Sequence, residues 1–138
     1  MKRTTWIGAV ALLALFATAA VAPRDAILGE WHGTSLCTDR KAAPACNDEI
    51  VVYRFTPAGG DTARCAAYRI TSGEEVPMGE LDFTRNAKSG DWAAGLGTPR
   101  VHAIWSFHVA DTLMTGTLTQ VPSGAVVRRV RATRTTRH

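Results

Sequence analysis

Short runs of alternating apolar and polar residues fill the chain from Ile27 onward. A period of two is typical of β-strands that bury one face. The pattern predicts eight strands: Leu28–Cys37, Glu49–Thr56, Arg64–Thr71, Met78–Asn86, Asp91–Leu96, Val101–Val109, Leu113–Gln120 and Ala125–Thr133. Turn-forming residues separate these runs, as at 57–60 and 122–124. No segment after residue 23 shows a helical stripe of useful length, so we expect an all-β domain.

The connections between these strands are short, so sequence neighbours should pair antiparallel. Repeated strands with tight turns can form a meander, a sandwich or a closed barrel. Among these we predict an eight-stranded antiparallel up-and-down barrel, because closure leaves no exposed edge strand. Such a barrel has room inside for packed side chains or for one small ligand. The length of 138 residues suits a single domain of this kind.

The inward face of the predicted barrel is rich in large apolar side chains. Trp105 and Phe107 share one face of the sixth strand, and Phe83 and Met114 lie on apolar faces of the fourth and seventh strands. We take Phe83, Trp105, Phe107 and Met114 as candidate contacts for a small apolar ligand. The same side chains could instead fill the interior completely.

The N-terminal end has the layout of a secretory signal peptide. Lys2 and Arg3 precede an uncharged apolar stretch, and small residues follow it up to Ala22. We predict a signal helix over 1–22 and a barrel domain over 23–138, in a periplasmic or secreted bacterial protein. The apolar stretch is shorter than the about 20 residues of a spanning helix, so we expect no membrane span after cleavage. Pro23 fits a protease groove poorly, which leaves cleavage after residue 19 or 20 open.

The three cysteines suit an oxidising compartment. Cys37 and Cys46 flank a polar stretch that reads as a loop returning on itself, so we prefer a Cys37–Cys46 disulfide among the three single pairings. Cys65 is then left over. It is either a small buried residue, or a thiol available for an intermolecular bridge or for reaction.

The net charge of +4 would fall to +2 without the two basic residues of the leader. The basic surplus lies in the last eleven residues, so a general nucleic-acid surface is not indicated. The chain lacks the motifs of a nucleophile elbow, a metalloprotease helix and a phosphate-binding loop. His102 and His108 lie about 20 Å apart along one strand and cannot share a metal ion. We therefore expect no enzymatic activity, no cofactor and no metal site.

Gly29-Glu30-Trp31 opens the first predicted strand. This tripeptide resembles the Gly-x-Trp motif of lipocalins and related calycin barrels, and the chain also resembles small exported bacterial barrels of undefined role. The resemblance implies a barrel floor in which a basic residue of the last strand lies across the tryptophan. Arg128 is on the inward face of that strand, so it is the expected partner of Trp31. The chain is shorter than lipocalins and shows neither a C-terminal helix nor a Thr-Asp-Tyr-like motif, so the resemblance concerns architecture more than ligand.

Two functions are compatible with these observations. The first is a non-enzymatic carrier whose interior holds a small apolar or amphipathic ligand. The second is a protein-interaction module, such as an inhibitor or an envelope-stress factor, that captures an envelope protein with the Cys37–Cys46 loop. A hollow interior favours the first function and a filled interior the second. We expect a monomer in either case.

Overall fold

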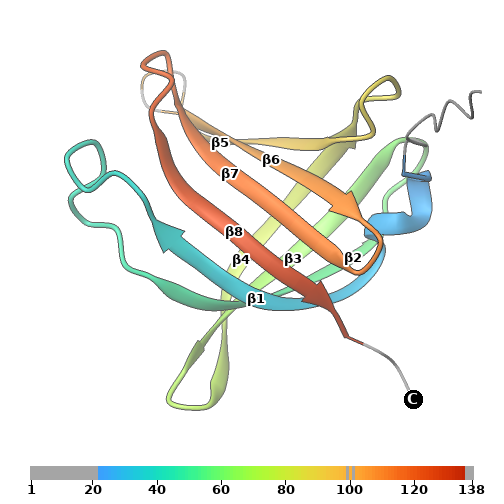
Figure 1. The fold of residues 1–138 in the computed structure, drawn as a ribbon, viewed down its shortest axis with the longest axis horizontal. Helices are drawn as coiled ribbons and strands as arrows, with labels where there is room; N and C mark the ends of the chain where they lie inside the picture. Colours follow the sequence, from blue (N-terminus) through green and yellow to red (C-terminus); the bar gives the residue numbers. More distant parts are fainter. Residues whose placement is uncertain (1–21, 99, 101, 136–138) are drawn as a thin grey trace, which may run out of the picture.

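Eight β-strands follow one turn of 3-10 helix in the computed structural model, which describes residues 22–98, 100 and 102–135 (Figure 1). The elements are η1 (Arg24–Ile27), β1 (Gly29–Cys37), β2 (Glu49–Pro57), β3 (Thr62–Thr71), β4 (Glu74–Arg85), β5 (Trp92–Gly97), β6 (His102–Ala110), β7 (Leu113–Val121) and β8 (Val126–Arg134). The predicted signal helix, apart from residue 22, lies outside the described residues. Within the described part of the chain, no helix is long and apolar enough to cross a membrane.

Each strand pairs antiparallel with the next, and β8 returns to β1, so the sheet closes into a barrel. This confirms the predicted eight-stranded antiparallel up-and-down barrel, an architecture that lipocalins share. The strand ends lie within two residues of their predicted positions, except that β4 begins four residues early. The tight turn there is Ser72-Gly73, whose φ angles are both positive, at 52° and 78°. The four residues that follow this turn, 74–77, therefore pair with the end of β3 instead of forming a loop.

A cluster of aromatic rings fills the middle of the barrel. Phe83 and Phe107 stack with their ring centroids 5.0 Å apart, and Phe55 meets Phe83 edge-on at 5.5 Å. Phe107 lies directly over Gly116 of the neighbouring strand, where an added Cβ would come within 2.1 Å of the phenylalanine ring. The glycine thus lets β7 pass beneath the ring, and the inward faces predicted from the period of two are those that form this core.

The floor of the barrel is closed by Trp31, which is fully buried. Its Nε1 donates a hydrogen bond to the carbonyl oxygen of Ile27 at 2.8 Å, which ties η1 across the end of the barrel. The guanidinium of Arg134 lies over the indole ring, 4.4 Å from its centroid, and also donates to the carbonyl oxygens of Leu28 and Ala26. Gly29 allows this approach, because its φ is +113° and a Cβ would lie 3.0 Å from Arg134 Nη1.

The prediction that Arg128 covers Trp31 is therefore wrong. The antiparallel register of β1 and β8 sets Trp31 opposite Arg134 and Cys37 opposite Arg128. Both arginines face inward, but six residues of strand separate them, which is about 20 Å. Arg128 accordingly lies at the opposite end of the barrel from the floor. The predicted strand ended at Thr133, one residue short of the arginine that performs this role.

The β4–β5 seam is the weakest join in the barrel. Only two residue pairs connect these strands, Thr84 with Ala93 and Arg85 with Trp92. By comparison, seven pairs join β1 to β8 and nine join β6 to β7. In Figure 1, β4 and β5 diverge beyond this point. Pro77 is tolerated in β4 because, among the described residues, the strand has no partner on the β5 side at that level.

Candidate ligand-binding site

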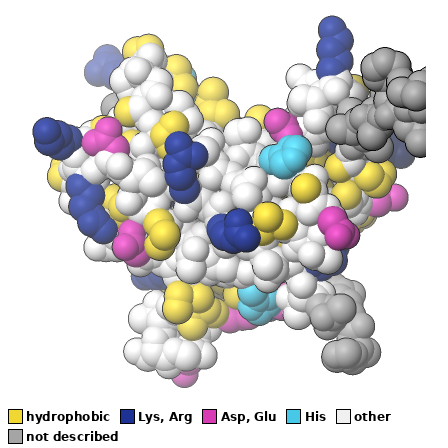
Figure 2. Space-filling model, viewed as in Figure 1, with side chains coloured by type: hydrophobic (Ala, Val, Ile, Leu, Met, Phe, Trp, Pro, Cys, Tyr) yellow, Lys and Arg dark blue, Asp and Glu magenta, His cyan; other side chains and the backbone are white. Residues whose placement is uncertain are grey.

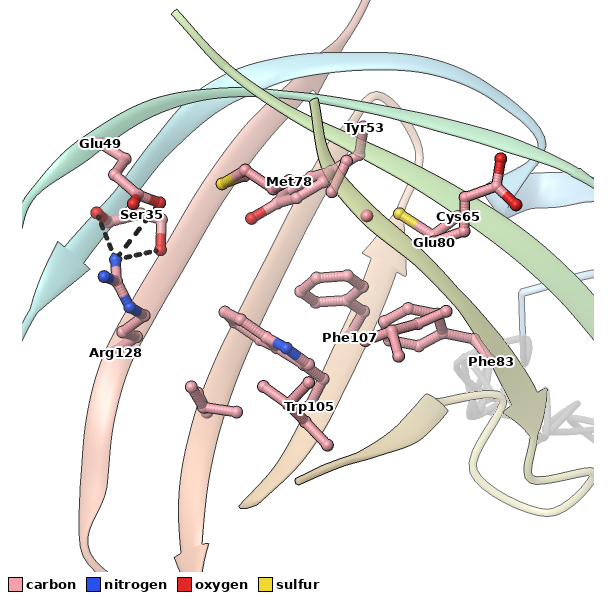
Figure 3. Close-up of a pocket in the computed structure, with 15 residues that line it drawn as sticks. Ser35, Glu49, Tyr53, Cys65, Met78, Glu80, Phe83, Trp105, Phe107 and Arg128 are labelled. Atoms are coloured by element: carbon pink, nitrogen blue, oxygen red, sulfur yellow. Dashed lines mark hydrogen bonds and ion pairs between the residues drawn. The ribbon is translucent and has the colours of Figure 1, made fainter. Parts of the chain in front are cut away.

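The barrel interior contains a partly open cavity of about 310 Å³ between the aromatic core and the open end (Figure 3). This volume lies at the lower end of the range of small-molecule sites. The lining residues are Ser35, Glu49, Tyr53, Cys65, Ala67, Met78, Gly79, Glu80, Leu81, Phe83, Leu96, Trp105, Phe107, Leu118 and Arg128. The interior is therefore hollow toward the open end of the barrel and packed toward the floor at Trp31.

Three of the four predicted contact residues line this cavity. Phe83, Trp105 and Phe107 form its aromatic wall, and Trp105 packs against Phe107 with ring centroids 5.7 Å apart. Met114 is inward-facing as predicted, but it is not among the lining residues. It is fully buried beside Val109, close to the floor, because it stands at the beginning of β7. The period of two identifies the face of a strand but not the depth along the barrel axis.

A polar cluster lies opposite the aromatic wall. Arg128 Nη1 donates to Ser35 Oγ at 3.1 Å and lies 3.7 Å from Glu49 Oε2 (Figure 3). The Arg128 and Glu49 side chains are only 15% and 20% exposed, and Ser35 is buried. An arginine and a glutamate thus share the wall of a largely apolar cavity. Sequence reasoning missed Ser35 and Glu49 as site residues, although both are in phase with inward-facing residues of their strands.

Burial raises the pKa values of two further lining residues, Tyr53 and Cys65. Burial raises the pKa of Tyr53 above its ordinary value, and a side-chain hydrogen bond with Ser35 opposes this rise. Burial also raises the pKa of the Cys65 thiol to about 12. Cys65 forms no disulfide and is buried, which matches its interpretation as a small core residue rather than a reactive thiol.

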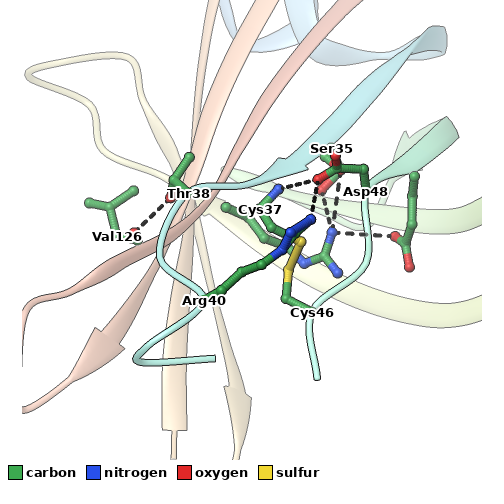
Figure 4. Close-up of a disulfide and its surroundings, with 9 residues drawn as sticks. Ser35, Cys37, Thr38, Arg40, Cys46, Asp48 and Val126 are labelled. Atoms are coloured by element: carbon green, nitrogen blue, oxygen red, sulfur yellow. Dashed lines mark hydrogen bonds and ion pairs between the residues drawn. A yellow bond between two sulfur atoms is a disulfide. The ribbon is translucent and has the colours of Figure 1, made fainter. Parts of the chain in front are cut away.

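The open end of the barrel is bordered by the loop that the disulfide closes (Figure 4). Cys37 and Cys46 are bonded, as predicted, with their Cα atoms 6.0 Å apart. Thr38 Oγ1 donates to the carbonyl oxygen of Val126 at 2.7 Å, and Gln120 Nε2 donates to that of Ala42 at 3.1 Å. These bonds hold the loop against β7 and β8 at the mouth of the cavity.

A shallow hollow beneath this loop adjoins the interior cavity. Leu96, Leu118 and Arg128 line both spaces, so Arg128 stands where they meet. His102 lines the outer hollow, and its Nδ1 is buried without a hydrogen-bond partner in the described part of the chain. The mouth thus combines apolar walls with polar groups that remain available.

The basic C-terminal strand is divided between two faces. Arg129 and Arg131 point outward and are exposed, whereas Arg128 and Arg134 point inward. On the face drawn in Figure 2, acidic, basic and hydrophobic side chains are interspersed. Among the described residues, no three His, Cys, Asp or Glu side chains are grouped closely enough to hold a metal ion.

Comparisons with known proteins add little to this picture. No protein-family model matches the chain, and no curated protein matches it by sequence. Among solved structures, the chain is similar to the siderocalin Ex-FABP, described as functioning through dual ligand specificities, with 16% identity and a TM-score of 0.46. The match covers 80% of this chain and 74% of that one. The fold class, a lipocalin-like eight-stranded antiparallel barrel, rests on the strand order of this chain itself.

Proposed function

We propose that the protein binds one small amphipathic ligand inside its barrel and carries out no chemistry on it. The observation that supports this function is the cavity of about 310 Å³, which has an aromatic wall on one side and a polar cluster on the other. Had the core side chains filled the interior, the protein-interaction function would have been favoured. The disulfide-closed loop then borders the entrance of the site and is not a surface that captures a protein partner.

The volume of the cavity limits the number of ligand atoms that fit inside the barrel. At about 30 Å³ per water-sized volume, the space holds roughly ten non-hydrogen atoms. A single alkyl chain of about ten carbons, or one or two fused rings, meets this limit. We place the protein outside the cytoplasm, because a Cys37–Cys46 disulfide persists in an oxidising compartment.

Filling the cavity tests the proposal. Ala67 lines the cavity, and its neighbour Ala66 has the opposite orientation on the same strand. Wild-type protein should enhance the fluorescence of the uncharged two-ring dye 1-aminonaphthalene in a saturable way, because the dye leaves water for an apolar wall. Ala67→Trp should abolish the enhancement, and Ala66→Trp should retain it.

Circular dichroism of both variants establishes that the barrel is intact. Equal dye binding by wild type and by folded Ala67→Trp would show that the dye binds elsewhere, and the interior site would be rejected. Loss of dye binding in both variants, with both folded, would also contradict the proposal, since the outward Ala66 does not touch the cavity.

A further inference from the structure

We infer that the ligand carries an anionic head group, which Arg128 binds through the edge of its guanidinium that none of the described residues occupies. This inference rests on the proposed interior site and adds the chemical class of the ligand: a short apolar chain or ring that ends in an acidic group. Arg128 had been expected in the barrel floor, and its position at the mouth of the cavity requires a different role.

The hydrogen bonds of Arg128 leave most of its donors unused. A guanidinium has five N–H donors. In the described part of the chain, both of its hydrogen bonds, to Ser35 Oγ at 3.1 Å and to the Ser35 carbonyl oxygen at 3.4 Å, start from Nη1. The ion pair with Glu49 also involves Nη1. Nε and Nη2, a pair of nitrogens that can bind a carboxylate or phosphate in bidentate fashion, have no partner among the described residues.

Glu49 does not form a close charge-assisted hydrogen bond with Arg128. The separation of 3.7 Å exceeds the about 2.7–2.9 Å of a charge-assisted hydrogen bond. The pair therefore supplies attraction across the cavity wall without the geometry that offsets the loss of hydration of both charges. An anionic ligand oxygen at Nε and Nη2 would supply that geometry.

The arrangement of the cavity sets the direction of the ligand. Arg128, Ser35 and Glu49 lie together on one side of the cavity, and Phe83 and Phe107 lie on the other (Figure 3). Arg128 also lines the outer hollow at the mouth. A head group at Arg128 therefore remains close to water while its apolar part extends toward the aromatic wall. This polarity favours an amphipathic acid over a wholly apolar compound.

A matched series of ten-carbon ligands tests the inference by isothermal titration calorimetry. Decanoate, decyl phosphate, decanol and decylamine share one apolar chain and differ in the head group. With wild-type protein, decanoate or decyl phosphate should bind about tenfold or more tightly than decanol, and decylamine most weakly. Whichever acid binds more tightly identifies the head group as carboxylate or phosphate.

Two substitutions assign the preference to particular groups. Arg128→Met keeps the side-chain length and should reduce the affinity for the acid to that for decanol, without weakening decanol binding. Glu49→Gln removes the competing carboxylate and should tighten acid binding. The double variant with both substitutions leaves no unpaired charge, so it reports the same loss of preference if Arg128→Met alone is unfolded.

The outcomes separate this inference from the proposed function. If none of the four compounds binds wild-type protein, the interior site itself fails. If decanol binds as tightly as the acids, or if folded Arg128→Met keeps the preference for acids, the site stands and the role of Arg128 is refuted. If decylamine binds most tightly and Glu49→Gln abolishes its binding, the cavity recognises a cation and the inference is overturned.

Discussion

Replacing Arg134 with methionine tests whether the guanidinium above Trp31 is what closes the barrel floor. The substitution removes a cation–π contact at 4.4 Å, worth about 1 kcal/mol at a half-buried site. It also removes hydrogen bonds from a charged donor to the carbonyl oxygens of Leu28 and Ala26, each worth about 1.5 kcal/mol. We expect the free energy of unfolding to fall by about 4 kcal/mol, which lowers Tm by roughly 15–20 °C in a domain of this size.

Arg128→Met is the matched control, because Arg128 is the other inward-facing arginine of the same strand. Arg128 donates two hydrogen bonds to Ser35, at 3.1 and 3.4 Å, and its ion pair with Glu49 is long, at 3.7 Å. It has no cation–π contact in the described part of the chain, so we expect a smaller loss of about 2 kcal/mol. Urea unfolding followed by tryptophan fluorescence measures both variants. Equal destabilisation by the two substitutions would refute the assignment of the floor contact to Arg134.

Three further predictions concern backbone strain, the free thiol and the disulfide. Gly29→Ala should lower the free energy of unfolding by about 1–3 kcal/mol, because the added Cβ is strained at a positive φ and also contacts the Arg134 guanidinium. Gly59→Ala is the control, since its φ is +93° but nothing lies near its Cβ, and it should lower the melting temperature less in the same thermal melt. Cys65 should react with iodoacetamide at pH 8 only after urea is added, because its pKa of about 12 leaves almost no thiolate in the folded protein; rapid labelling without urea would contradict this. Replacing Cys37 and Cys46 with serine should lower the free energy of unfolding by about 2.5 kcal/mol for a loop of this length, as measured by urea titration, and an unchanged midpoint would show that the disulfide contributes nothing.

The strands were predictable because their signal is local. Each strand alternates in polarity, and each turn contains residues that suit it, so neither depends on distant parts of the chain. The exception, the early start of β4, has a local cause as well. Two glutamates and Pro77 suggest a loop, but the positive φ angles of Ser72 and Gly73 complete the turn before them.

Positions along the barrel axis were not predictable in the same way. Alternation indicates that Arg128, Arg134 and Met114 all face inward, and they do. Whether an inward residue meets the floor or the mouth depends on the register between β8 and β1, which are distant in sequence. One rule would have corrected the floor contact: in an antiparallel barrel the start of the first strand lies beside the end of the last.

The cavity could not be predicted, because it depends on whether the inward side chains together fill the volume of the barrel. Phe83, Trp105 and Phe107 were expected either to fill the interior or to line it, and only coordinates decide between these cases. The polar cluster did leave a signal in the sequence. Ser35 and Glu49 are polar residues in inward phase, at the ends of strands whose other inward positions are mostly apolar. An inward polar residue in an otherwise apolar series is a reason to expect a site.

The sparse pairing of β4 with β5 bears on how quickly the interior exchanges its contents. Parting these two strands breaks the hydrogen bonds of only two residue pairs, whereas opening any other wall breaks several times as many. Met78, Gly79, Glu80 and Leu81, consecutive residues of β4 at this place, all border the cavity. Local opening is therefore expected mainly on this side of the barrel, and under the proposed function it would give the ligand a second exit besides the mouth without global unfolding.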